Sequence, residues 1–301
     1  MESAEAFAPA HITGLFQIFD EPIDLLRKGS KGAGISLKHG VKTRVILERE
    51  MRNSLEVWIN GHKTSSAEVS ETVVKEYLSR TKEKFAVKVE HKVQVPIGAG
   101  FGSSGAAALS LSLALNKALN LGLTRLNAAQ IAHIAEVKCR TGLGTVIAET
   151  FGGLEIRIAP GAPGIGKLRQ IPLSKEYRVV CLSFGSLYTK KALTDVELRE
   201  RINRQGEKLL QLLMKQPTLE NFLKLSRSFA ENTGLITEKV RKVLDETIAS
   251  GIICSMPIFG EGVFSIVKQN MVDPLLEVFR KNVFTGKTFV SEIDFKGARL
   301  L

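Results

Sequence analysis

A glycine-rich segment between a predicted strand and a predicted helix constrains this chain most. Valines at positions 87, 89, 93 and 95 share one face of a strand that Pro96 ends. Residues 97–105 then read Ile-Gly-Ala-Gly-Phe-Gly-Ser-Ser-Gly and lead into an apolar helix predicted over 103–120. Glycine lets the backbone turn and approach a ligand closely, and a helix N-terminus attracts anions. The segment therefore predicts a phosphate-binding loop.

This segment has three other interpretations: a Walker A loop, which fails, a dinucleotide-binding loop and a purely structural turn. A Walker A loop needs lysine directly after its last glycine, where this chain has Ala106. The spacing Gly100-x-Gly102-x-x-Gly105 matches the dinucleotide fingerprint, but residues 120–138 predict a turn and a helix rather than the second strand. A nicotinamide-dependent oxidoreductase therefore stays an alternative, as does a purely structural glycine turn.

Composition narrows the partners and the compartment. The 301 residues carry 42 Lys and Arg against 31 Asp and Glu, a net charge of +11 that suits anionic substrates. No nucleic-acid motif accompanies this charge, so no nucleic-acid partner is expected. The three cysteines match no metal spacing, and their odd number without a secretory N-terminus favours a reducing, cytoplasmic setting. The longest apolar run is too short to cross a bilayer, so no membrane partner is expected.

Strands and helices are mixed in both halves, which predicts an α+β class. A first strand is expected to break at Pro9, and residues 27–34 are expected to form a basic glycine-rich loop. The proline- and glycine-rich stretch 159–166 is typical of a linker, so lobes of 1–165 and 166–301 are predicted. Further strands are predicted over 35–48, 54–59, 178–184, 262–268 and 287–295, and further helices over 67–82, 126–138, 194–215, 218–231, 235–250 and 271–281.

The glycine loop also resembles a known signature. Pro96-x-Gly98-x-Gly100-Phe101-Gly102-Ser103-Ser104-Gly105-Ala106 is similar to the GHMP kinase pattern Pro-x-x-x-Gly-Leu-Gly-Ser-Ser-Ala-Ala. Residues 8–14 and 255–262 lie where the first and third motifs of that superfamily belong, although the third match is degenerate. More narrowly, residues 6–14, 28–34 and 141–144 resemble archaeal pantoate kinases, strongly over the first 160 residues and loosely beyond. The resemblance implies a two-lobed GHMP kinase fold with a ferredoxin-like C-terminal lobe.

The same resemblance implies an activity and its partners. It implies a kinase that uses ATP and Mg²⁺ to phosphorylate the 4-hydroxyl of (R)-pantoate, giving 4-phosphopantoate for coenzyme A biosynthesis. A kinase of another small hydroxy acid or alcohol, such as homoserine or mevalonate, is the alternative within the fold. The expected partners are small molecules, and both a monomer and a homodimer remain open.

Phosphoryl transfer needs a phosphate cradle, a cation and an oriented acceptor. Ser104 at the helix start and Glu136 on the next predicted helix are the candidate catalytic residues and Mg²⁺ ligands. A helix cap for Ser104 and a surface position for Glu136 are the structural alternatives. The predicted ATP- and phosphate-binding residues are Pro96, Gly98, Ala99, Gly100, Phe101, Gly102, Ser103, Ser104 and Gly105.

The pantoate carboxylate calls for a cationic or hydrogen-bonding partner. Arg157 is the first candidate, with Ser30, His133 and Thr189 as further substrate contacts. Structural alternatives stay open for two of them. Arg157 could be an exposed strand residue, and His133 could be a hydrogen-bonded histidine of the core.

Thr145 departs from the pattern that the resemblance implies. After Gly142-Leu143-Gly144 an aspartate is expected as the base or as the group that orients the acceptor, and Thr145 stands there instead. A neutral hydroxyl does not take up a proton as a carboxylate does. Thr145 is kept as a catalytic candidate with three explanations: transfer without a strong base, substitution by Glu149, or a catalytically weakened nucleotide-binding protein.

Overall fold

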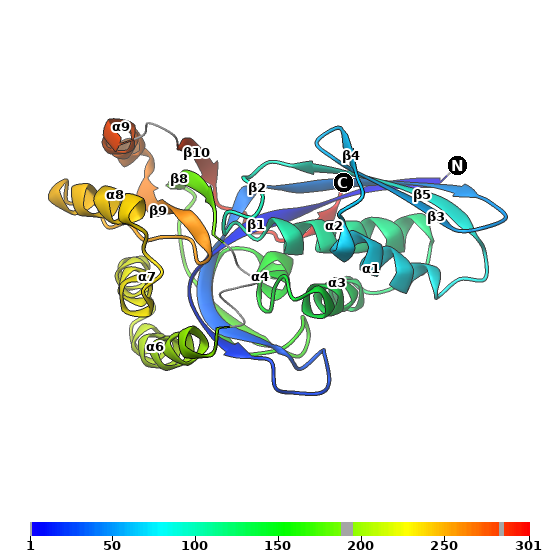
Figure 1. Ribbon diagram of the computed structural model, residues 1–301, viewed down its shortest axis with the longest axis horizontal. Helices are drawn as coiled ribbons and strands as arrows, with labels where there is room; N and C mark the ends of the chain where they lie inside the picture. Colours follow the sequence, from blue (N-terminus) through cyan, green and yellow to red (C-terminus); the bar gives the residue numbers. More distant parts are fainter. Residues whose placement is uncertain (1, 188–194, 283–285) are drawn as a thin grey trace.

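The computed structural model describes residues 2–187, 195–282 and 286–301 and contains two β-sheets with flanking helices (Figure 1). The mixture of helices and strands confirms the α+β class. The strands are β1 (Glu2–Phe19), β2 (Gly29–Arg49), β3 (Ser54–Ile59), β4 (His62–Thr64), β5 (Phe85–Val93), β6 (Leu154–Ala159), β7 (Lys167–Ile171), β8 (Tyr177–Ser186), β9 (Gly260–Lys268), β10 (Lys287–Glu292) and β11 (Arg299–Leu300). The helices are α1 (Glu68–Leu78), α2 (Ser103–Ala118), α3 (Arg125–Cys139), α4 (Thr145–Phe151), α6 (Val196–Lys215), α7 (Leu219–Thr233), α8 (Glu238–Ala249) and α9 (Val272–Asn282).

The larger sheet is built around the long antiparallel pair β1–β2. Strand β2 pairs with β5 along its second half and with β6 along its first half, and β3 runs parallel to β5. Helices α1 to α4 cover one face of this sheet (Figure 1). Val87 and Val89 are buried against the helix side as the period-two pattern predicts, and most of α2 is buried beneath the sheet. The sheet and α2 therefore share one core, which fixes where the glycine-rich loop emerges.

Two expectations for the N-terminal region are wrong. Strand β1 continues through Pro9, because a register shift between Pro9 and Ala10 leaves the proline without a required ladder donor. Residues 29–34 are the start of β2 rather than a loop, because β1 pairs on one side and β6 on the other. The backbone bonds of these flanking strands outweigh the local preference of glycine for turns.

The smaller sheet has the order β10-β8-β9, with every pair antiparallel. A bridge between Ser255 and Phe264 adds the position of a fourth strand beside β9. Helices α6, α7 and α8 precede this bridge, and α9 connects β9 to β10. This connectivity matches the predicted ferredoxin-like lobe, with its second strand reduced to one bridge.

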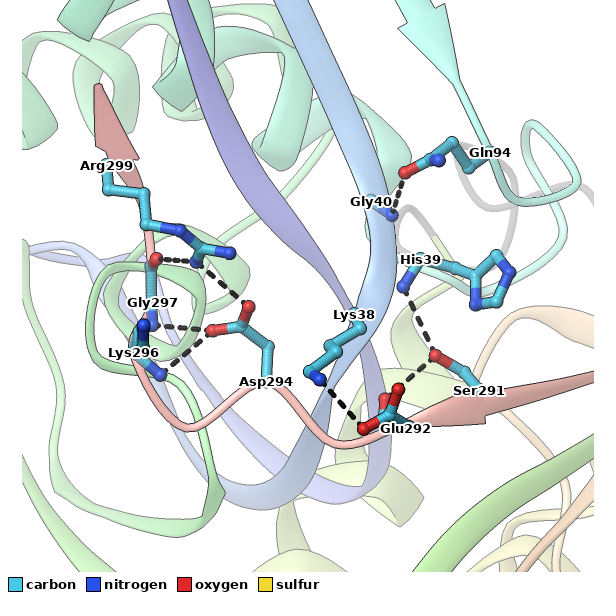
Figure 2. Close-up of polar contacts among 10 residues, drawn as sticks. All are labelled: Lys38, His39, Gly40, Gln94, Ser291, Glu292, Asp294, Lys296, Gly297 and Arg299. Carbon is cyan, nitrogen blue, oxygen red and sulfur yellow. Dashed lines mark hydrogen bonds and ion pairs between the residues drawn. The ribbon is translucent and has the colours of Figure 1, made fainter. Parts of the chain in front are cut away.

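The C-terminal segment ties the two sheets together (Figure 2). Lys38 of β2 pairs with Glu292 of β10 at 2.7 Å. The Asp294 carboxylate accepts hydrogen bonds from two backbone amides and from Arg299. Backbone bonds from this segment also reach the Gly153 amide and the Glu149 carbonyl. The segment thus fixes α4 and the start of β6, which border the site described below.

The strand pairing also bears on the predicted division of the chain into lobes of 1–165 and 166–301. Residues 159–166 join β6 to β7 within the larger sheet, and β11 returns to pair with β1 in the same sheet. The second part of the sequence therefore contributes two strands to the first sheet. A boundary at residue 165 stays a prediction. Within the described ranges, no helix combines the length and the apolar character needed to span a bilayer.

Candidate active site

A cleft of about 750 Å³ opens in front of the glycine-rich loop. It is bordered by β1, β2, α1, β6, the start of α2 and the turn before α4. One end has the apolar side chains Ile59, Val69, Val93 and Ile97 in its wall, beside polar ones that include Ser66 and Glu68. The other end contains Thr13, Ser30, Gly144 and Arg157. The loop and the first turn of α2 lie between these ends, so the cleft joins an apolar end to a polar one.

The glycine-rich loop has a backbone shape that only glycine adopts easily. Gly98, Gly100 and Gly102 have φ values of 73°, 81° and 63°. Gly102 is the N-cap of α2, and no side chain caps the helix. In the described chain, the amides of residues 103–105 have no hydrogen-bond acceptor. Three free amides at the start of a 16-residue helix form a binding site for an anion such as phosphate.

A short hydrogen-bonded group joins α2 to α3 beside these amides. The Ser104 hydroxyl donates to Glu136 Oε1 at 2.5 Å, and the Thr141 hydroxyl donates to the same oxygen at 2.6 Å. Burial raises the pKa of the Glu136 carboxyl, while the two hydroxyl donors act in the opposite direction. A buried carboxylate next to a hydroxyl is a favourable partner for a cation, because a positive charge offsets the cost of burial.

The Ser104–Glu136 pair suits a cation that takes most of its ligands from phosphate oxygens and water. Mg²⁺ usually takes one or two protein carboxylates and completes its shell with phosphate oxygens and water. Among the residues that the structure describes, no three His, Cys, Asp or Glu side chains gather into a ready metal site. Ser104 and Glu136 therefore fit a metal that arrives with a triphosphate.

The polar end of the cleft contains a buried ionic cluster. Glu155 and Arg157 are two residues apart on β6, so their side chains share one face. Arg157 Nη1 donates to Glu155 Oε1 at 2.5 Å, and His11 Nε2 lies 3.1 Å from the same oxygen. Burial lowers the pKa of His11, while the neighbouring Glu155 carboxylate acts in the opposite direction. Ser30 Oγ and Arg157 Nε both lie against Gly144, where a Cβ would collide with the serine hydroxyl.

Glu149 lies directly behind the glycine-rich loop. Its side chain is fully buried, and neither carboxylate oxygen has a hydrogen-bond partner among the described residues. A Cβ on Gly102 would lie 2.7 Å from Glu149 Oε1, and a Cβ on Gly105 would lie 2.8 Å from Oε2. Burial raises the pKa of Glu149 well above its ordinary range, and the nearby Glu136 adds to the effect.

Comparison with known proteins places the chain in a family. The profile described as "GHMP kinases N terminal domain" matches residues 68–153. A pantoate kinase from Methanocaldococcus jannaschii is 36% identical over 281 residues, which cover 92% of this chain and 97% of that protein. The chain belongs to the pantoate kinase family. A pantoate kinase from Thermococcus kodakarensis is 37% identical over 275 residues, covering 87% of each chain.

A solved structure supports the same assignment for the fold. The protein described as "Phosphotransferase related to CoA biosynthesis pathway" has a TM-score of 0.89 and 31% identity, and the match covers 99% of this chain and 98% of that one. The GHMP kinase fold and the class of small-molecule kinase are therefore confirmed for this member of the pantoate kinase family.

Most of the predicted site residues of this family member line the cleft. Pro96 and Ala99 are part of the loop but do not line it. The predicted residues that line the cleft are Ser30, Gly98, Gly100, Phe101, Gly102, Ser103, Ser104, Gly105, Glu136, Thr145 and Arg157. Their roles in binding and catalysis stay predictions.

Two predicted substrate contacts fall elsewhere. His133 does not line the cleft, and its buried ring lies 3.2 Å from the Leu25 carbonyl oxygen. This position corresponds to the structural alternative of a hydrogen-bonded core histidine. Thr189 lies outside the described residues.

The structure also shows cleft residues that the sequence did not single out as functional. Arg140 is exposed at the cleft and ends α3 in a left-handed conformation. His11 lines the polar end, and Glu155 lies behind it. The spacing of two residues between Glu155 and Arg157 is the sequence signal for this pair, because on a strand it places both side chains on a common face.

Replacing Glu149 with glutamine is expected to stabilise the protein at alkaline pH. The pKa of Glu149 is higher in the folded protein than in the unfolded one. The folded protein therefore loses stability as the pH rises from the unfolded-state pKa of this carboxyl through its folded-state pKa. Glutamine does not ionise and avoids this cost. Thermal unfolding should show a gain of about 3 °C or more at pH about 8, shrinking toward pH about 4. If the melting temperature of Glu149→Gln at alkaline pH were equal to or lower than that of wild type, the raised pKa of Glu149 would be contradicted.

Proposed function

We propose that this protein transfers the γ-phosphoryl group of ATP to the 4-hydroxyl of pantoate. The observation that carries the proposal is one arrangement: three unpaired helix amides and the Ser104–Glu136 pair lie in the same cleft as the Arg157 guanidinium. Phosphates, a divalent cation and a carboxylate each have a chemically matched partner there. Membership of the pantoate kinase family supports the choice of acceptor.

ATP would lie along the cleft with its triphosphate on the glycine-rich loop. The amides of residues 103–105 are suited to the phosphate oxygens, and the exposed Arg140 is a further cation for them. The apolar end, with Ile59, Val69, Val93 and Ile97, suits a flat purine ring. Ser104 and Glu136 would hold Mg²⁺, which supplies charge neutralisation on the phosphates when it is bound.

Pantoate would lie at the polar end of the cleft. Arg157 is proposed to hold its carboxylate, and Ser30 beside Gly144 is proposed to donate a hydrogen bond to it. The 4-hydroxyl oxygen would then face the triphosphate, form the new P–O bond and displace ADP, with the hydroxyl proton released. Any contribution of His133 would be indirect, through the loop that contains Leu25.

Thr145 is proposed to orient the acceptor without acting as a base. A loose phosphoryl-transfer transition state depends mainly on positioning and electrostatics. Thr145→Val should therefore lower kcat by less than about tenfold, whereas loss of a general base costs about a hundredfold or more. Steady-state kinetics with saturating ATP and pantoate provide the measurement. A hundredfold loss would assign Thr145 a part in proton transfer instead.

An ADP-release assay with a panel of acceptors tests the proposed function. Pantoate should be turned over with the highest kcat/KM, and homoserine and mevalonate should be poor acceptors. The carboxylate alone does not distinguish these acceptors, because all three carry one. Turnover of homoserine or mevalonate in preference to pantoate would keep the kinase assignment and overturn the acceptor.

A further inference from the structure

Arg157 is anchored at one edge of its guanidinium. Its Nη1 donates to Glu155 Oε1 at 2.5 Å, and both side chains are buried, with 1% and 0% of their surface exposed. The same carboxylate is engaged by His11, whose Nε2 lies 3.1 and 3.3 Å from the two oxygens. The Thr13 hydroxyl in turn lies 3.3 Å from His11 Nδ1. Glu155 is thus held from two sides and has little freedom to move.

The other edge of the guanidinium has no such anchor. Arg157 Nε is buried and has no hydrogen-bond partner among the described residues. It lies beside Gly144, where a Cβ would come within 3.1 Å of it, and Gly144 lines the cleft. A buried N–H without an acceptor is costly, so the edge that contains Nε favours an incoming acceptor.

Arg157 has a second buried acidic side chain in its surroundings, Glu149. The buried Glu149 carboxyl has no hydrogen-bond partner among the described residues and acts electrostatically on the guanidinium. It belongs to α4, behind the glycine-rich loop and away from the wall of the cleft. Because burial raises the pKa of Glu149 and favours its neutral form, Glu155 is the carboxylate that anchors Arg157.

We propose that Glu155 is a positioning residue for the acceptor carboxylate. By holding Nη1, Glu155 keeps the edge of Arg157 that contains Nε beside Gly144 and toward the cleft. His11 and Thr13 support Glu155 from β1, and the His11 amide donates to the Phe101 carbonyl of the glycine-rich loop at 3.0 Å. The acceptor site and the phosphate loop are thereby built on the same short segment of β1. This inference rests on the proposed function, which assigns the carboxylate of pantoate to Arg157.

Glu155→Ala tests the inference. The KM for pantoate, and its Kd measured by calorimetry with a non-hydrolysable ATP analogue present, should both rise by about tenfold or more. The KM for ATP should change by less than about twofold, because the hydrogen-bond partners of the Glu155 side chain among the described residues are His11 and Arg157, and neither belongs to the loop. Glu155→Gln keeps an oxygen that accepts from Nη1, so its KM for pantoate should stay within about twofold of wild type.

A double-substitution cycle separates positioning from mere structure. If Glu155 acts through Arg157, adding Glu155→Ala to Arg157→Ala should not raise the pantoate KM further. A further tenfold rise in that background, an equal rise in both KM values, or an unchanged pantoate KM in Glu155→Ala would each overturn the inference. Should Glu155→Ala not fold, Glu155→Asp withdraws the anchor by one methylene and should raise the pantoate KM by about fivefold; no rise would overturn the inference as well.

Two different outcomes distinguish a failure of the proposed function from a failure of the positioning role of Glu155. If wild-type protein neither binds nor phosphorylates pantoate, the proposed function fails and the inference falls with it. If wild-type protein phosphorylates pantoate and Arg157→Ala weakens its binding, but Glu155→Ala does not, only the positioning role fails.

Discussion

Glu136→Gln is expected to lower kcat by about a thousandfold, because it removes the single carboxylate proposed to hold Mg²⁺ beside the helix amides. The substitution preserves the shape of the side chain and its ability to accept from Ser104 or Thr141. It removes only the charge that a metal requires. Steady-state kinetics with a titration of Mg²⁺ should show the loss and a higher metal requirement.

Stability provides the control for this variant. Burial raises the pKa of Glu136, so a neutral glutamine is expected to leave the melting temperature unchanged or higher. A well-folded Glu136→Gln protein with wild-type kcat at low Mg²⁺ would show that the metal is held elsewhere. Ser104→Ala should lower kcat less, since a hydroxyl contributes no charge to the metal.

Arg157→Ala is expected to raise the KM for pantoate by about a hundredfold, because a buried charged hydrogen bond to the substrate carboxylate is lost and Glu155 loses its cationic partner. The KM for ATP should change little. The measurement compares pantoate with pantoamide, the amide that lacks the negative charge. Wild-type protein should prefer pantoate strongly, and the variant should show almost no preference.

Arg157→Lys is the matched variant for that experiment. Lysine keeps the charge but lacks the planar fork that holds Glu155 on one edge and an acceptor on the other. Its KM for pantoate should fall between those of wild type and Arg157→Ala. If Arg157→Ala kept the full preference for pantoate over pantoamide, the carboxylate would bind at another residue.

The central part of the fold could be predicted from local sequence patterns. The valine alternation in β5 matches the structure, because it depends on neighbouring residues of one strand. The continuous course of β1 through Pro9 could not be predicted in this way. It depends on β2, which lies next to β1 in the sheet and supplies the register shift.

The residues of the candidate site also differ in whether local sequence patterns could predict their positions. The glycine-rich loop and Ser104 form a continuous segment with a strand before it and a helix after it, so their position could be predicted. Glu136 is a sequence candidate because a carboxylate on the predicted helix suits Mg²⁺, but its contact with Ser104 depends on α3 packing against α2. The environment of Arg157 could not be predicted, because its partner Glu155 shares the carboxylate with His11, a residue 144 positions away. The position of His133 depends on the Leu25 carbonyl, a contact with no sequence pattern.

The most direct test is a crystal structure of the protein with a non-hydrolysable ATP analogue, Mg²⁺ and pantoate. The triphosphate should accept hydrogen bonds from the amides of residues 103–105, with the metal between Ser104 and Glu136 and the pantoate carboxylate at Arg157. A triphosphate bound away from residues 98–105 would contradict the account.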